Sequence, residues 1–188
     1  MNAIERIKKI LTSPKTEWEV IASEETTARE VLKSYLIFVA LIPAIGSFIG
    51  CGVVGYKNMI GEHTHLITSG VRQALISFVG IIAGTYITAH VLNRLAAKFN
   101  STANFDKAFQ LVAYSYAPMC IAGILHIFPS LSSIAGIISM YGLYIFYLGI
   151  APMMKTPEEK VTAYFLSVLI FVILIFLLLS MLLAILYF

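Results

Sequence analysis

The feature that most constrains this chain is the spacing of its charged residues, which leaves four long uncharged stretches. These stretches are 23, 21, 47 and 28 residues long and cover 34–56, 73–93, 108–154 and 161–188. A bilayer core about 30 Å thick is crossed by about 20 apolar residues of helix. Three of the stretches therefore hold one span each, and the stretch of 47 residues holds two. The spacing predicts five membrane spans.

The stretch of 47 residues needs a reversal, and Phe128-Pro129-Ser130 supplies one. Proline cannot continue a helix, and a following serine can cap a new one. Runs such as Leu166–Leu179 do not alternate in polarity as barrel strands do, so we expect an all-α transmembrane bundle. The predicted spans are 34–55, 72–92, 107–127, 131–153 and 162–187, preceded by a separate N-terminal segment of residues 1–33.

Composition excludes several classes of protein. Of 188 residues, 59% are hydrophobic and only 12% are charged, about half the share in a soluble domain. Such a chain cannot cover a water-soluble surface, which excludes an ordinary soluble enzyme and a disordered tail. The net charge of +3 is too small and too unevenly placed to indicate nucleic-acid binding.

The positions of Lys and Arg predict the orientation. Eleven of the 13 basic residues lie in residues 1–33, in the loop after the second predicted span or in the loop after the fourth. Lys57 and Arg72 are on the opposite side. Basic loops are usually cytoplasmic. We therefore expect the N-terminus inside and the C-terminus outside, with the first span retained as an anchor rather than cleaved as a signal peptide.

Residues 1–33 are predicted to form two short helices. In the first, isoleucines lie on one face, while the other face carries Arg6, Lys8 and Lys9, as in helices that lie on anionic membrane surfaces. Pro14 suits the start of the second helix, in which Trp18 would anchor at the interface. Lipid or partner recognition and simple packing against the bundle are equally compatible with this pattern.

The layout resembles the Yip-domain family, which is named for interaction with Ypt/Rab GTPases. The resembling segments are 11–21 (LTSPKTEWEVI), 105–109 (FDKAF), 113–118 (AYSYAP), 141–149 (YGLYIFYLG) and 156–160 (TPEEK). The resemblance implies a five-span bundle with a cytoplasmic N-terminus. Eukaryotic relatives act in secretory trafficking through a longer N-terminal region. The short region here is similar to the prokaryotic branch, in which Rab partners are absent, and implies an inner-membrane location.

The predicted spans contain few groups that could do chemistry. They lack the mid-membrane carboxylate of a proton-coupled transporter, and we expect neither enzymatic activity nor a cofactor. The one weak metal candidate combines His63 and His65 of the first outer loop with His126 at the end of the third span. Solvated loop histidines are the simpler interpretation.

Two patterns of small and hydroxyl-bearing residues remain. Gly46 and Gly50, and likewise Gly80 and Gly84, have the four-residue spacing that lets helices pack closely within or between chains. Pro118 predicts a kink in the third span. Tyrosine and serine side chains near this kink and in the fourth span could line a ligand pocket, or could simply pack. These residues are Tyr114, Ser115, Tyr116, Tyr141, Tyr144 and Tyr147.

The sequence therefore predicts a non-enzymatic Yip-like membrane protein that organises membrane, as in trafficking, or recruits lipids or an unidentified cytoplasmic protein. Association into homo-oligomers is compatible with the glycine pattern. The alternative is a small channel or transporter for an ion or a small polar or amphiphilic solute, lined by the tyrosines.

Overall fold

The structure is a computed structural model that describes residues 3–57, 63–64 and 67–187. Five of its helical segments are long and apolar enough to cross a membrane, which confirms the predicted all-α fold with five spans. The spans are Ala28–Val54, Ile67–Phe99, Phe105–Ile127, Pro129–Met154 and Glu158–Met181.

Two short helices precede the spans, and most spans are interrupted by a change of helical geometry. The N-terminal helices are α1 (Ala3–Thr12) and α2 (Pro14–Ser23). The first span comprises α3 (Ala28–Val31), the π-helical η1 (Leu32–Leu36), α4 (Ile37–Phe48) and the π-helical η2 (Ile49–Val54). The strands β1 (Tyr56–Lys57) and β2 (His63–Thr64) pair antiparallel before the second span.

The other four spans follow in chain order. The second comprises α5 (Ile67–Leu95) and the 3-10 helix η3 (Ala96–Phe99). The third comprises α6 (Phe105–Ser115), α7 (Ala117–Ala122) and the 3-10 helix η4 (Gly123–Ile127). The fourth comprises the 3-10 helix η5 (Pro129–Leu131), α8 (Ser132–Ser139) and α9 (Tyr141–Met154), and the fifth is α10 (Glu158–Tyr187).

Local sequence signals explain where several helices begin and end. Thr27 and Glu30 form a capping box at the start of the first span. The helix that contains this span begins at Ala28, six residues before the uncharged stretch that starts at 34, because the charged residues of its first turns are also helical. Phe128 is extended between η4 and η5, which confirms the predicted reversal. The third span is interrupted at Tyr116, just before Pro118, as the missing N–H of proline predicts.

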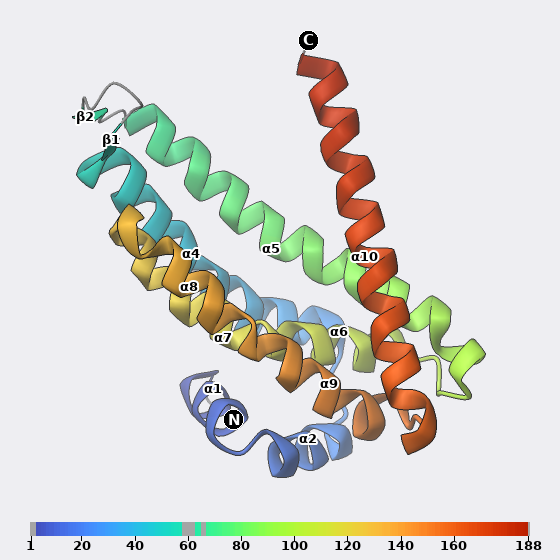
Figure 1. Cartoon of the computed structure of the whole chain (residues 1–188). Coiled ribbons are helices and arrows are strands. Elements are labelled where there is room, and N and C mark those ends of the chain that lie inside the picture. Colours follow the sequence, from blue (N-terminus) through green and yellow to red (C-terminus); the bar gives the residue numbers. More distant parts are fainter. Residues whose placement is uncertain (1–2, 58–62, 65–66, 188) are drawn as a thin grey trace.

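The third span forms the centre of the bundle and the fifth lies at its edge. Every residue from Ala108 to Ser115 is buried, and α6 packs against α5, α9 and α3. By contrast α10 has its larger contacts with α5, η3 and α9, and its C-terminal part diverges from the bundle (Figure 1). Its second half exposes large apolar side chains, as expected for a helix that faces lipid.

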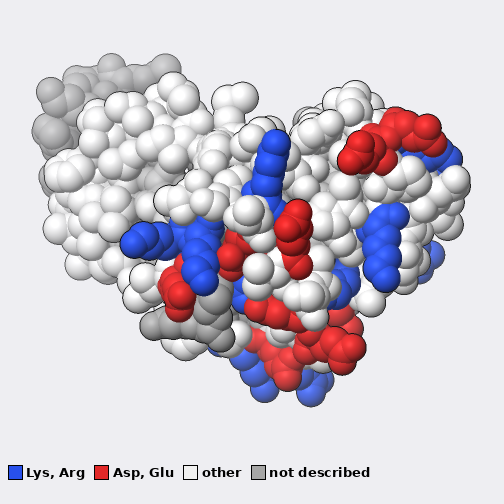
Figure 2. Space-filling view, turned by 90° about the horizontal axis from the view of Figure 1, so that it is seen from below, with Lys and Arg blue, Asp and Glu red and all other residues white. Residues whose placement is uncertain are grey.

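The segments predicted to share one side of the membrane lie together at one end of the bundle. We call this the charged end and define it as residues 3–33, 94–107 and 155–160. Lysine, arginine, aspartate and glutamate side chains gather there (Figure 2), whereas the strands and the C-terminal part of α10 lie at the opposite end (Figure 1).

Candidate functional site

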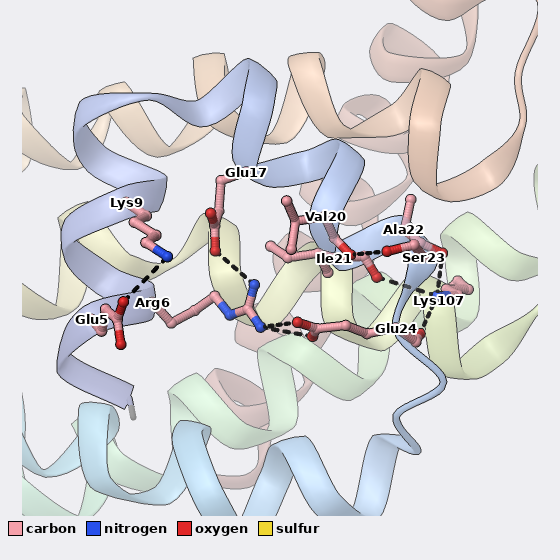
Figure 3. A network of polar contacts seen from close by, with 10 residues as sticks. All are labelled: Glu5, Arg6, Lys9, Glu17, Val20, Ile21, Ala22, Ser23, Glu24 and Lys107. Atoms are coloured by element: carbon pink, nitrogen blue, oxygen red, sulfur yellow. Dashed lines mark hydrogen bonds and ion pairs between the residues drawn. The ribbon is translucent and has the colours of Figure 1, made fainter. Parts of the chain in front are cut away.

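The N-terminal helices form a hairpin that is fastened to the bundle by a buried arginine. Arg6 of α1 donates through Nη1 to Glu17 Oε1 at 2.6 Å, and through Nη2 to the two carboxylate oxygens of Glu24 at 2.5 and 2.7 Å (Figure 3). Its guanidinium carbon lies 5.6 Å from the centre of the Tyr114 ring in α6. Arg6 and Glu17 are each only 5% exposed. The network joins α1, α2 and the third span.

The electrostatics of this network keep Arg6 charged. Burial lowers the pKa of Arg6, but the hydrogen bond and negative charge of Glu24, together with Glu17 and Tyr114, outweigh burial and raise the pKa above its ordinary value. A buried charge is tolerated when it is paired and hydrogen-bonded. The expectation that Arg6 belongs to an outward basic face is therefore wrong: its side chain points into the protein.

Trp18 fastens the same hairpin to α9. Its ring is fully buried, and its Nε1–H donates to the carbonyl oxygen of Ile145 at 3.0 Å. Gly149 lies directly against the indole and leaves room for it. The prediction that Trp18 anchors α2 at the lipid interface is therefore wrong, because the ring is enclosed by protein; it anchors α2 to the bundle instead.

The N-terminal end of α6 holds the linker between α2 and α3. Lys107 Nζ donates to the carbonyl oxygens of Ile21, Ala22 and Glu24 at 3.3, 2.8 and 2.6 Å, and so satisfies acceptors at the C-terminal end of α2. Asp106 Oδ1 accepts from the backbone N–H of Ala28 at 2.7 Å. Gln110, fully buried, donates to the Thr26 carbonyl.

The outer surface of the hairpin remains charged. Lys8, Lys9 and Lys15 are exposed, and Lys9 Nζ lies 3.2 Å from Glu5 Oε1 across one helical turn. Exposed acidic residues of α2 and the following linker, Glu19 and Glu25, lie on the same end. The charged end thus presents residues of both signs to its surroundings (Figure 2).

The tyrosines proposed to line one pocket lie in three different surroundings. Tyr114 packs edge-on against Tyr35 beneath Arg6. Tyr141 donates to the Leu11 carbonyl at 3.1 Å and stacks on the exposed Tyr144, while Tyr147 bonds to Thr162. Ser115 and Tyr116 line a cavity between the third span and α10. The buried Pro118 lies against Gly142, which also lines that cavity.

The glycines of the two spaced pairs differ in what they contact. A Cβ atom at Gly46 or Gly50 would collide with the backbone of η4, at Gly123 and His126 respectively. A Cβ atom at Gly84 would lie 3.5 Å from the Phe176 ring and 3.5 Å from the Tyr116 hydroxyl, which is ordinary van der Waals contact. At Gly80, a Cβ atom would meet no described atom within 4 Å, so packing of Gly80 between chains stays a prediction.

The histidines offer no metal centre within the described residues. His126 lies 3.5 Å from the Ser47 hydroxyl, measured from Nδ1 to Oγ. His63 belongs to β2, and His65 lies outside the described residues. Among the side chains that the structure describes, no group of three or more His, Cys, Asp or Glu residues could hold a metal ion.

Sequence reasoning missed most of the residues that hold the hairpin. The sequence pattern indicated no role in holding the hairpin for Glu17, Glu24, Asp106, Lys107 or Gln110, all of which are polar. One signal was available. Arg6 and Glu17 follow the same helical stripes as the apolar Ile10 and Ile21, which are fully buried.

Comparison with known proteins identifies one matching family model and two similar bacterial proteins. It matches the sequence model of the Yip1 domain over residues 8–181. It is also similar to the inner membrane protein YohC from two strains of Escherichia coli, one of them strain K12. Each YohC is 24% identical over 157 residues, which cover 80% of this chain and 80% of the relative. No solved structure gives a significant match.

Proposed function

Because the chain belongs to the Yip1 domain family, we propose that it is a non-enzymatic protein of the inner membrane that recruits a protein partner through the hairpin at its charged end. The inner-membrane location is supported by the five spans and by the location stated in the names of the two relatives. The charged end would then face the cytoplasm, where basic loops usually lie.

The observation that carries this proposal is the fixed position of the hairpin. Arg6 joins the two helices of the hairpin to each other, Trp18 bonds α2 to α9, and Lys107 bonds α6 to the end of α2. These bonds hold the outer surface of the hairpin in one arrangement. A surface that is already ordered loses less conformational entropy on binding than a flexible tail does. Buried ion pairs add little net stability, and geometric specificity is a role attested for them in some proteins.

The distribution of charge favours a protein over a bare lipid surface as the partner. A segment that binds anionic lipid by electrostatics is predominantly basic. Here the hairpin and the linker after it expose Lys8 and Lys15 and also Glu19 and Glu25. Mixed charges of this kind suit a complementary protein surface, where they determine which partner is accepted.

Proximity labelling in the membrane tests the proposal. The full chain would carry a labelling enzyme at its N-terminus and be compared with a Lys8→Glu, Lys15→Glu double variant. We expect the double variant to lose the proteins enriched by the wild-type chain, because both side chains are exposed and neither contributes to the buried network.

The matched control is Arg72→Glu, which reverses an exposed charge at the opposite end. It should retain the wild-type enrichment. Identical enrichment by the double variant and the wild type, at equal membrane levels, would contradict recruitment through the hairpin.

Transport is the weaker candidate. The tyrosines proposed to line a path are separated, with Tyr114 beneath Arg6 and Tyr147 bonded to Thr162 of α10. Together they do not outline a single route along the bundle.

A further inference from the structure

A cavity of about 180 Å³ lies where α10 leaves the bundle. Its walls come from the second, third, fourth and fifth spans and are mostly apolar, with Val112, Phe146, Val168 and Val172 among the lining side chains. The hairpin contributes none of the lining residues, so the cavity is separate from the surface proposed above to recruit a partner.

The divergence of α10 opens this cavity toward the lipid. Tyr164 and Val168 are fully buried against the bundle, whereas Ile170, Phe171 and Leu174 are exposed within the following two turns. The surroundings of a membrane span are lipid hydrocarbon. The molecules with ready access to the cavity are therefore lipid chains.

One polar group in the cavity stands out from its neighbours. Thr88 is 8% exposed, and its Oγ1 makes no hydrogen bond within the described part of the chain. The hydroxyls of Ser115 and Ser139, which also line the cavity, donate to carbonyls of their own helices at 2.7 Å. Thr85, one turn earlier in α5, likewise donates to the Ile81 carbonyl.

An unbonded hydroxyl in a dry site is costly, so a partner for Thr88 would stabilise the protein. The side chain of Tyr116 lines the same cavity, and its hydroxyl lies 3.5 Å from where a Cβ atom of Gly84, one turn before Thr88, would stand. The two hydroxyls together leave at least one O–H that can donate to a ligand. They therefore suit a ligand that brings a hydrogen-bond acceptor.

The position of Thr88 along the membrane normal indicates which hydrogen-bond acceptor of a lipid can reach its hydroxyl. Thr88 precedes Arg94 by six residues of α5, about 9 Å along the helix axis. Arg94 belongs to the charged end, so Thr88 lies in the half of the apolar layer, about 15 Å thick, that is nearer that end. The nearest acceptors of a lipid in that leaflet are the ester carbonyls that join its chains to the head-group region.

We propose that this cavity binds one acyl chain of an ester-linked membrane lipid from the leaflet at the charged end, with its ester carbonyl accepting a hydrogen bond from Thr88. The volume fits a segment of chain and not a whole lipid, since an apolar cavity of about 150 Å³ holds one benzene molecule. The rest of the lipid lies along α10.

Lipid titration of the purified full chain in detergent tests this site, with bound lipid counted by native mass spectrometry. The probes are dioleoyl-phosphatidylglycerol and its ether-linked analogue, which lacks the ester carbonyls. We expect the wild-type chain to bind the ester lipid about two- to ten-fold more tightly, as one hydrogen bond allows.

Three variants separate the cavity from general lipid coating. Thr88→Val removes the hydroxyl while keeping the shape, and should abolish the difference between ester and ether lipids. The matched control Thr85→Val should preserve it, because the Thr85 hydroxyl is already bonded within α5. Val172→Phe fills the cavity from the α10 side and should weaken binding of both lipids.

Equal affinity of the wild-type chain for the two lipids would overturn the proposal, and that comparison requires no variant to fold. Two further results would also overturn it: Thr88→Val behaving like Thr85→Val, or Val172→Phe binding both lipids as the wild type does.

Discussion

The absence of a side chain at Gly149 allows Trp18 to pack against α9. Its backbone lies against the indole of Trp18 and a methyl group of Leu111, with the indole carbons Cε2 and Cζ2 at 2.6 and 2.9 Å from where a Cβ atom would stand. Contacts closer than 3.0 Å force a neighbour to move. The hydrogen bond from Trp18 to Ile145, one turn earlier in α9, depends on the same close approach.

We expect Gly149→Ala to displace Trp18 from α9. The extra methyl group overpacks the site and should lower the free energy of unfolding by about 1–3 kcal/mol. Trp18 is the only tryptophan of the chain, so its fluorescence reports the displacement directly. The emission maximum of Trp18 should shift to longer wavelength, and its indole should become more accessible to an aqueous quencher.

Gly136→Ala is the matched control, because no described atom lies within 4 Å of the Cβ it would add in α8. It should leave the emission of Trp18 unchanged and slightly stabilise the helix. If the two substitutions have the same effect on Trp18, close packing at Gly149 is not what positions the indole.

At the scale of elements, the α1–α2 hairpin is held by a buried charge network together with apolar packing. Its first helix reaches the bundle through Arg6 and the apolar side chain of Ile10, both buried. Removing one partner of a buried ion pair leaves an uncompensated charge, which costs far more than losing an exposed pair.

Glu17→Ala should therefore loosen α1 while leaving the spans intact. The lost hydrogen bond to a charged group corresponds to about 1.5–3 kcal/mol, so amide exchange in α1 should accelerate about 10- to 100-fold. Hydrogen exchange read by mass spectrometry would measure this, with peptides of α6 as the internal reference.

The control is Glu5→Ala, which breaks the exposed ion pair between Glu5 and Lys9 on the same helix. Exposed pairs contribute about 0–1 kcal/mol, so exchange should change little. Equal acceleration by both substitutions would mean that the buried network does not hold the hairpin.

For the whole molecule, the charged end decides the orientation that we propose. The segments rich in lysine and arginine meet at one end of the bundle, and the C-terminal part of α10 points away from that end (Figure 1, Figure 2). The positive-inside rule then orients the charged end toward the cytoplasm.

A reporter enzyme that is active only outside the inner membrane should be active when fused after Phe188 and inactive when fused after Asn100. Asn100 lies in the connection between η3 and α6 at the charged end. Activity at Asn100 together with inactivity at Phe188 would show the reverse orientation.

Features that depend on neighbours in the chain could be predicted. Pro14 lies at the start of α2 as predicted, and Thr27 and Glu30 have the three-residue spacing of the capping box that they form. Pro129 follows the reversal between the third and fourth spans. Each of these residues acts on its own backbone within one helical turn, so its effect can be read from its type and spacing.

Features that depend on distant partners could not be predicted. Arg6 shares a helical stripe with the buried Ile10, but its type and spacing do not show that Glu17, Glu24 and Tyr114 surround its charge. Gly80 has the same four-residue spacing as Gly46, yet among the described residues Gly46 lies against another backbone and Gly80 does not. Residue type and spacing do not distinguish these cases.

The sequence by itself determined the number of spans and the gathering of charge at one end, because placing charge in hydrocarbon is costly and restricts where charged residues can lie. Only the tertiary structure decided that Arg6 and Trp18 fasten the hairpin, and that the divergence of α10 leaves a cavity beside Thr88. Both outcomes depend on how helices far apart in the chain approach one another, and small differences in packing among many side chains determine that approach.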